Sequence, residues 1–404
     1  MVGAMRVPLL DLSEQYRTLA EPLRAEVEEI FATQQFILGP KGAAFEKAMA
    51  DYCGSPHAIG VSSGTDALLA ILMALGIGPG DAVVTTAYTF FATAGCVTRV
   101  GATPVFVDID PVTYNISPAA IAQYLAEYCY RAADGSLVNQ ASQKVRAIMP
   151  VHLFGLCCDM EAILEIARQY ELTVIEDAAQ AIGAEYPFKH RPAAQAGTIG
   201  EVGSFSFYPS KNLGAAGDAG LVVCQTDELA EKLRVCRQHG MEQRYFHHFV
   251  GGNFRLDEIQ AAILNVKLPY LNGWSAGRRM VADIYREEFT RRGLTKHIDL
   301  PAEPYREFGL TNHHIYHQFV IRTKQRNALR EHLTSKEIGS AIYYPLGLHQ
   351  QDCFAYLGYG EGQLPETERA TRETLALPIY PELTREAQIF VVDTIEEFFA
   401  NTAA

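Results

Sequence analysis

The sequence has few features that would place the protein outside the cell or in a membrane. Its eight cysteines in 404 residues show no paired CxxC spacing, and this density is far below that of disulfide-stapled secreted domains. The N-terminus lacks a basic start followed by a long apolar core, so no signal peptide is expected. The longest apolar stretch, residues 67–78, is shorter than the roughly 20 residues that cross a bilayer. We therefore expect reduced thiols, a cytoplasmic protein and no membrane partner.

Positive charge is also scarce. The chain has 34 lysines and arginines against 47 aspartates and glutamates, which gives a formal net charge of −13. Non-specific nucleic-acid binding depends on the neutralisation of phosphates by Lys and Arg, so no nucleic-acid partner is expected. No GxGxxG sequence follows a predicted strand, which argues against a dinucleotide-binding oxidoreductase.

The sequence also lacks a pattern typical of a bound metal. Cys157 and Cys158 are adjacent, but no second cysteine or histidine pair accompanies them. The histidines His313, His314 and His317 would bind a metal only if carboxylates converged on them, and a solvated or interface role is the alternative. We therefore predict no metal site.

From residue 43 to about residue 223, short apolar segments alternate with helical ones. The predicted strands cover residues 82–86, 104–107, 145–151 and 172–175, and the predicted helices cover 43–52, 66–75, 93–100, 118–132 and 160–170. Short apolar strands separated by helices are typical of a mostly parallel sheet that is covered on both faces. Residues 130–143 are polar and are expected to form a surface excursion.

After residue 256 the pattern changes. The expected elements are helices at 257–268 and 277–292, strands at 316–321 and 340–344, a helix at 326–335, and closing helices at 366–375 and 385–399. This predicts two domains: an N-terminal arm with a large domain over residues 1–264, and a smaller α+β domain over residues 265–404.

Two short segments could bind different parts of one ligand. Residues 61–68, VSSGTDAL, form a turn that opens into a helix, where free amides favour an anion, or they form a plain capped helix. Residues 174–180, VIEDAAQ, form an apolar strand that ends in two carboxylates, at the edge where parallel sheets bind ligands. A carboxylate there could hold a protonated ring nitrogen, and a helix cap or a metal ligand is the alternative.

Two further segments extend this pattern. In residues 203–214, GSFSFYPSKNLG, no charged residue lies within six positions of Lys211. Burial would favour the neutral amine that an aldehyde needs, whereas a solvated turn lysine is the alternative. Residues 251–255, GGNFR, could present an amide and a guanidinium to a phosphate, or form an ordinary loop. A phosphate, an aldehyde and a ring nitrogen occur together in pyridoxal 5'-phosphate (PLP).

These ordered motifs resemble those of the DegT/DnrJ/StrS-type nucleotide-sugar aminotransferases, within the aspartate aminotransferase superfamily of PLP fold type I. The resemblance covers nearly the whole chain, through FILGPKGAAFEKAMADYCG, VSSGTDALLA, TTAYTFFATA, GATPVFVDID, VHLFG, IEDAAQAIGA, SFSFYPSKNLGAAGDAG, GNFRLDEIQAA, YYPLGLHQQ and LALPIYPEL. It implies an α/β fold with a large PLP-binding domain, built on a mostly parallel mixed sheet covered by helices, and a smaller C-terminal α+β domain. It also implies a homodimer with shared active sites.

The resemblance implies roles for four residues around the cofactor ring. Lys211 would bond covalently to PLP and then act as the catalytic base. Asp177 would pair with the pyridine nitrogen, and Gln180 would hydrogen-bond the ring hydroxyl. Phe90 would stack on the ring face, although as an isolated residue it would suit core packing.

The resemblance also implies residues for the phosphate and the sugar. Gly64, Thr65 and Ser206 would hold the phosphate from one subunit, although Ser206 alone would suit an ordinary strand hydroxyl. Asn253 would reach the phosphate from the other subunit. The residues implied at the sugar are Tyr343, Tyr344 and His349, and a structural histidine is the alternative for the last.

The implied function is transfer of an amino group from L-glutamate to a keto-hexose linked to a nucleoside diphosphate, in the biosynthesis of an amino or deoxyamino sugar. Asp218, in GAAGDAG, is similar to the residue in relatives that aminate C3 of the sugar. Gly347 stands where many relatives carry a proline near the sugar. The alternatives are a PLP-binding regulator or sensor and a PLP-dependent sugar dehydratase. Relatives that dehydrate replace the lysine with histidine, whereas this chain keeps Lys211. The sugar and the nucleotide (UDP, dTDP or GDP) stay open.

Overall fold

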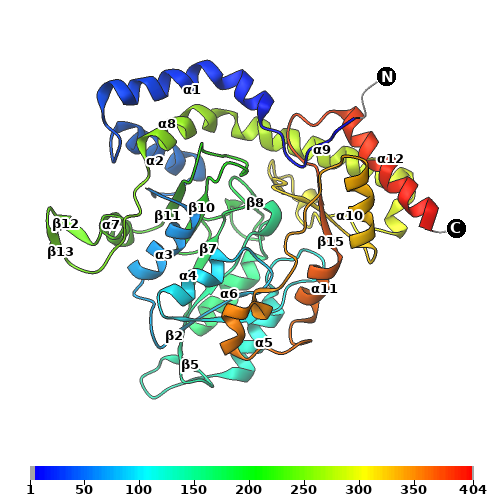
Figure 1. Cartoon of the computed structure of the whole chain (residues 1–404). Helices are drawn as coiled ribbons and strands as arrows, with labels where there is room; N and C mark the ends of the chain where they lie inside the picture. The colour runs from blue at the N-terminus through cyan, green and yellow to red at the C-terminus, as the bar shows by residue number, and fades with distance from the viewer. Residues whose placement is uncertain (1–4, 403–404) are drawn as a thin grey trace.

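A nine-stranded sheet forms the centre of the computed structural model, which describes residues 5–402 (Figure 1). Seven strands follow the order β1-β11-β10-β7-β6-β2-β3, and the hairpin β4–β5 joins through β6. All neighbours from β10 to β3 are parallel, while β11 is antiparallel to both β1 and β10. The strands are β1 (His57–Val61), β2 (Asp81–Thr86), β3 (Thr103–Val107), β4 (Cys129–Arg131), β5 (Leu137–Asn139), β6 (Lys144–Met149), β7 (Thr173–Asp177), β10 (Val202–Ser206) and β11 (Gly220–Cys224). This arrangement confirms the predicted α/β fold with a mostly parallel mixed sheet.

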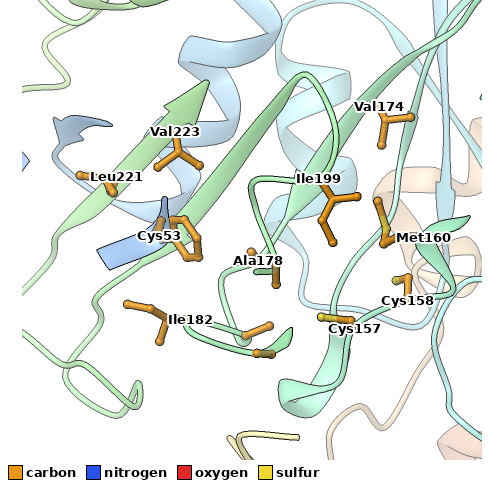
Figure 2. Packing of buried hydrophobic residues seen from close by; sticks show 14 of the residues in the cluster. Cys53, Cys157, Cys158, Met160, Val174, Ala178, Ile182, Ile199, Leu221 and Val223 are labelled. Carbon is orange, nitrogen blue, oxygen red and sulfur yellow. The ribbon is translucent and has the colours of Figure 1, made fainter. Parts of the chain in front are cut away.

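Helices cover both faces of this sheet because its strands are apolar on both sides. Successive residues point to opposite faces of a strand, so Val83 packs with α3, α4 and α7, whereas Val84 packs with α2, α5, α6 and α8. Figure 2 shows part of the cluster that contains Val84, in which Val174, Leu221 and Val223 of the sheet pack with neighbouring apolar side chains. The helices are α2 (Pro40–Cys53), α3 (Gly64–Ala74), α4 (Ala92–Arg99), α5 (Pro118–Tyr128), α6 (Met160–Tyr170), α7 (Asp227–Cys236) and α8 (Glu258–Lys267).

A separate hydrophobic cluster, away from the two faces of the large sheet, lies in the C-terminal part of the chain. It is built from α9 (Leu271–Arg291), α10 (Arg326–Ser335), α12 (Arg385–Thr402) and the antiparallel pair β14 (Phe319–Arg322) and β15 (Thr374–Leu377). The N-terminal Val7 packs into this cluster and pairs with Ile338, before α1 (Ser13–Thr33) runs along α8 (Figure 1). The domain boundary at residues 264 and 265 stays a prediction. The remaining elements are α11 (Pro365–Glu373), β8 (Glu185–Tyr186), β9 (Ala194–Gln195), β12 (Met241–Gln243) and β13 (Phe246–His247).

One carboxylate of the large sheet caps a helix of the C-terminal part. Asp108, directly after β3, accepts hydrogen bonds from the Glu366 amide (2.9 Å) and from the amide and hydroxyl of Thr367 (2.8 Å each). These groups lie in the first turn of α11, where backbone amides lack partners within the helix. The cap therefore joins the edge of the sheet to the C-terminal part.

Several local predictions differ from the structure. The predicted helix 118–132 ends at Tyr128, where β4 follows, and the predicted strand 316–321 begins only at Phe319. Residues 130–143 are mostly exposed, as a surface excursion should be, but they include β5 and most of β4, which pair because the apolar Leu137 and Val138 are buried. The predicted strand 340–344 is wrong, since its one bridge joins Ala341 to Ala376. The predicted helix 366–375 ends at Glu373, because the buried segment that follows forms β15. Among residues 5–402, we find no helix with the length and apolarity needed to cross a membrane.

Candidate active site at the carboxyl ends of the central strands

Several of the predicted site residues lie at the carboxyl ends of two adjacent parallel strands. Asp177 is the last residue of β7, and Ser206 is the last residue of β10. Lys211 follows in a turn where its amide donates to the Tyr208 carbonyl (2.8 Å). Open α/β sheets bind ligands outside this edge. The topology therefore brings Asp177 close to Ser206 and Lys211, which lie 29 and 34 positions further along the sequence.

The turn around Lys211 is tight, and it shelters the amine. A Cβ atom on Gly214 would lie 2.3 Å from the Pro209 carbonyl oxygen, so the chain can close this turn only with glycine there. Burial lowers the pKa of Lys211 to about 8, and the nearby Asp177 carboxylate opposes that shift. An ordinary lysine titrates near 10.4. A much larger share of this amine is therefore neutral, and so nucleophilic, near neutral pH.

The Asp177 carboxylate is buried and held in one orientation. Its Oδ2 accepts from the Thr93 hydroxyl (2.8 Å), and its Oδ1 accepts from the Ala179 amide (3.2 Å). Burial raises the pKa of Asp177, whereas these two hydrogen bonds and the charge of Lys211 oppose the increase. A carboxylate with few partners in a buried site suits a cationic ligand, because the cation compensates for the lost hydration.

The neighbouring carboxylate, Glu176, serves the fold instead. Its Oε2 lies 2.7 Å from Nε2 of His152, and Nδ1 of that histidine accepts from the Cys158 amide (3.0 Å). The imidazole therefore donates from Nε2 to Glu176. Of the two acids in the VIED segment, Asp177 is the one close to Lys211. Glu176 also accepts from three backbone amides within 2.8 Å, those of Gly197, Ile199 and Gly200.

The N-terminus of α3 lies against the end of β10. Ser63 caps the helix by accepting from the Asp66 amide (3.0 Å), and the first helical bond runs from the Ala67 amide to the Ser63 carbonyl (2.9 Å). The amides of Gly64 and Thr65 therefore have no acceptor within the helix. A Cβ atom at Gly64 would lie 2.7 Å from the Cβ of Ser206. These three residues form a close-fitting cradle that suits an anion.

Aromatic residues of the C-terminal part reach the same edge. The Gln180 Oε1 accepts from the Phe154 amide (2.8 Å), and its Nε2 donates to the Tyr344 hydroxyl (3.0 Å). The Phe90 ring is 58% exposed, and its centroid lies 6.4 Å from that of Tyr344. Tyr343 is half-buried beside it. Gln180, Phe90 and Tyr344 are thus brought together as a wall of the site.

Two further predicted residues make no side-chain hydrogen bond to this group within residues 5–402, although the Ser62 amide donates to the Phe254 carbonyl (3.0 Å), next to Asn253. Asn253 is exposed, its backbone pairs with Gln238, and its side chain makes no hydrogen bond within residues 5–402. His349 is buried, with Nε2 at 3.4 Å from Glu368, and burial lowers its pKa. A Cβ on Gly347 would lie 2.6 Å from the His349 ring, so glycine is needed there for this packing. The roles of both residues stay predictions.

Two residues near Lys211 were missed in the sequence. No sequence pattern marks Asn212, although it follows Lys211 directly, and for His317 the sequence indicates only a metal ligand or a solvated or interface role. Both are buried, and the His317 Nδ1 lies 3.1 Å from the Asn212 Oδ1. No local pattern could have linked positions so far apart in the chain.

In the described part of the chain, no three His, Cys, Asp or Glu side chains are grouped to hold a metal.

Comparison with known proteins relates this geometry to a family. A sequence profile of the DegT/DnrJ/EryC1/StrS aminotransferase family matches residues 18–396. The pleiotropic regulatory protein of Geobacillus stearothermophilus is 47% identical over 400 residues, covering 99% of this chain and 100% of that protein. The UDP-N-acetyl-3-dehydro-alpha-D-glucosamine 3-aminotransferase of Acidithiobacillus ferrooxidans is 41% identical over 389 residues, covering 96% of both. The solved structure of S. venezuelae DesV in complex with a ketimine intermediate has a TM-score of 0.87 and 36% identity, covering 97% of this chain and 98% of that one.

Proposed function

Because the chain belongs to the DegT/DnrJ/EryC1/StrS aminotransferase family, we propose that it transfers an amino group from L-glutamate to C3 of a keto-hexose linked to a nucleoside diphosphate. Enzymes of this family depend on PLP. The similarity to a UDP-sugar 3-aminotransferase and the presence of Asp218 support amination at C3. The reaction would supply an amino or deoxyamino sugar. The eight free cysteines, most of them buried, support a cytoplasmic location.

The observation that carries this proposal is that Lys211 and Asp177 lie close enough at one sheet edge for their charges to interact. When bound, PLP supplies a ring that withdraws electrons from the substrate carbon. Lys211, with its pKa lowered to about 8, would bond to the aldehyde carbon and, once displaced, move a proton at Nζ. The buried Asp177 carboxylate would keep the ring nitrogen protonated, because a cation compensates for its lost hydration. Proton transfer by a positioned group typically contributes a factor of about 10²–10⁴.

The remaining cofactor contacts are proposed from the shape of the site. The free amides of Gly64 and Thr65 and the Ser206 hydroxyl would bind the phosphate. Because Gly64 has no side chain, α3 and the end of β10 lie close enough for these groups to contact one phosphate. Gln180 would donate to the ring hydroxyl, and Phe90 would cover the ring face. In support of these roles, Gly64 and Thr65 begin α3 and Ser206 ends β10. Gln180 and Phe90 lie in the loops that follow β7 and β2.

Three residues of the C-terminal part are proposed for the sugar. The position of Tyr344, which bonds Gln180 and lies beside Phe90, supports this role. Tyr343 and His349 are proposed because they share its segment. We also propose the division into a large domain, residues 1–264, and a small domain, residues 265–404. The separate C-terminal hydrophobic cluster supports it.

We propose a homodimer in which each site takes residues from both chains. Three aromatic residues at or near the candidate site residues in the sequence are exposed, Phe90 (58%), Phe91 (47%) and Tyr208 (55%), and large apolar side chains exposed near a site support association. Asn253 would then reach the phosphate of the partner subunit. Close to it in the sequence, the β12–β13 hairpin projects from the fold and exposes Tyr245 (76%) (Figure 1).

Mixing two inactive variants tests the shared site. Lys211→Ala and Asn253→Ala chains are each expected to be nearly inactive. In a random mixture, half of the dimers are mixed, and one of their two sites has both intact residues. About one quarter of wild-type activity should therefore return. Activity that stays at the level of the separate variants would contradict shared sites.

The substrate is tested with purified holoenzyme and L-glutamate. A panel of 3-keto and 4-keto sugars linked to UDP, dTDP or GDP is added, the product mass is measured, and NMR locates the new amine. We expect amination at C3, and none with Lys211→Ala. Amination at C4 would refute the regiochemistry. A purified protein that binds PLP but forms no product with any donor or acceptor would favour a regulator. The family membership and the retained Lys211 do not favour that alternative or a dehydratase.

A further inference from the structure

A segment of the C-terminal part, residues 315–318, lies directly against the Lys211 turn. The Asn212 Nδ2 donates to the Ile315 carbonyl (3.0 Å), and its Oδ1 lies 3.1 Å from the His317 Nδ1. The side-chain oxygen of Asn212 faces the ring because its nitrogen faces a carbonyl. The His317 Nδ1 therefore carries the hydrogen, and Nε2 keeps its lone pair. Asn212 is 6% exposed and His317 is 6% exposed, so water does not compete for these bonds.

The same segment also supports Gln180. It runs beside η1 (Leu153–Gly155), where the Phe154 carbonyl accepts from the Gln318 amide (3.3 Å) and the Gly155 carbonyl accepts from the Ile315 amide (3.0 Å). The Phe154 amide in turn donates to Gln180 (2.8 Å). One segment thus contacts both the turn of the proposed catalytic lysine and the backbone that holds the proposed ring-hydroxyl partner.

A buried arginine fixes the backbone of this segment. Arg278 is 2% exposed, and its Nη1 donates to the carbonyls of Tyr316 (3.1 Å), His317 (3.4 Å) and Ile379 (3.0 Å). Burial and the charges of Lys211 and Arg278 lower the pKa of His317 well below its usual range. The imidazole is therefore neutral beside the amine at physiological pH.

We propose that Asn212 and His317 form a positioning pair that holds the Lys211 turn against residues 315–318, an inference that rests on the proposed cofactor role of Lys211. The pair acts through geometry: two buried hydrogen bonds fix the residue next to the lysine. A displacement of about 1 Å at a reacting group can lower the rate about 100-fold. The neutral state of His317 matters because a second cation there would repel the protonated amine that forms during proton transfer.

The test compares four variants of the holoenzyme. His317→Phe removes the donor to Asn212, His317→Asn retains a donor at that position, and Asn212→Ala removes the partner. His314→Asn is the matched control, since His314 is buried on the same stretch but accepts from the Tyr316 amide (3.0 Å) and faces Glu303 rather than Lys211. The measurements are the absorbance band of the lysine-bound cofactor, kcat, KM and the melting temperature.

For His317→Phe and Asn212→Ala, we expect kcat to fall about 10- to 100-fold with a change in KM below about threefold. The absorbance band should weaken in both variants. His317→Asn should recover most of the band and of kcat, and the control should keep both. The double variant Asn212→Ala/His317→Phe should be no slower than either single variant, because the two residues act through one contact.

Two results would overturn the proposal. The first is a folded His317→Phe enzyme with wild-type kcat and a wild-type band, and if that variant does not fold, the same result for Asn212→Ala decides. The second is an equal loss in the control, which would indicate general destabilisation. Failure of the proposed function is distinguishable, because the wild-type protein would then lack a cofactor band that Lys211→Ala abolishes.

Discussion

Replacement of Gly64 by alanine tests the proposed phosphate cradle most directly. The new Cβ would lie 2.7 Å from the Cβ and 3.2 Å from the Oγ of Ser206, whereas carbon atoms pack at about 3.5–4.0 Å. α3 or the end of β10 must therefore move by several tenths of an ångström. Over-packing of this kind costs about 1–3 kcal/mol. The free energy of unfolding should fall by that amount, and the affinity for PLP should fall as well, because the free amides move.

The assay measures chemical denaturation of the protein without cofactor and PLP binding by absorbance titration. Gly273→Ala in α9 is the control, since no atom lies within 4 Å of its added Cβ, and in a helix this change stabilises by up to about 1 kcal/mol. The double variant Gly64→Ala/Ser206→Gly relieves the contact. It should regain more stability than PLP affinity, because it also lacks the Ser206 hydroxyl. Wild-type stability and PLP affinity in Gly64→Ala would refute the crowded cradle.

Three further predictions concern the acids and the lysine. Asp177→Asn should lower kcat about 100-fold or more while PLP still binds, since the ring nitrogen loses its anionic partner; a kcat within threefold of wild type would contradict this role. In the protein without PLP, competitive acetylation of Lys211, quantified by mass spectrometry across pH, should reach half its maximum near pH 8. Because Asp177 raises that pKa, the Asp177→Asn midpoint should be lower, and an unchanged or higher midpoint would show that the two groups do not interact. Glu176→Gln should destabilise the fold by about 1–3 kcal/mol in urea denaturation, because the buried His152 and three amides lose a charged acceptor and the new amide cannot accept from all of them; an unchanged stability would contradict this network.

Much of the fold could be predicted because its strands bury both faces. A segment such as Val174–Ile175 is apolar without alternation, which indicates a covered parallel strand and locates β7 and the acids that follow it. Family membership and the α/β fold were predicted correctly from ordered motifs. The strand at 340–344 was wrong because the position of a short strand depends on which segment pairs with β14. That partner is β15, which lies more than 50 residues further along the chain than β14.

The site could be predicted only in part from the residues themselves. Lys211 stood out because uncharged residues surround it in the sequence, but its burial needed the fold. The two acids Glu176 and Asp177 look alike in sequence, and their opposite environments follow from the alternation of side chains along β7. His317 could not be predicted, because its contact with Asn212 joins positions 105 residues apart.

The cap that Asp108 provides for α11 also bears on movement within the protein. Three hydrogen bonds fasten the start of α11 to the last strand of the sheet, so a rotation of the C-terminal part that keeps them must turn about this point. Displacements would then be smallest beside α11 and larger along α10 and α12, farther from the pivot. If this attachment persists, the amides of Glu366 and Thr367 should exchange hydrogen more slowly than unpaired amides in the first turns of other helices. Equally rapid exchange would show that the attachment opens.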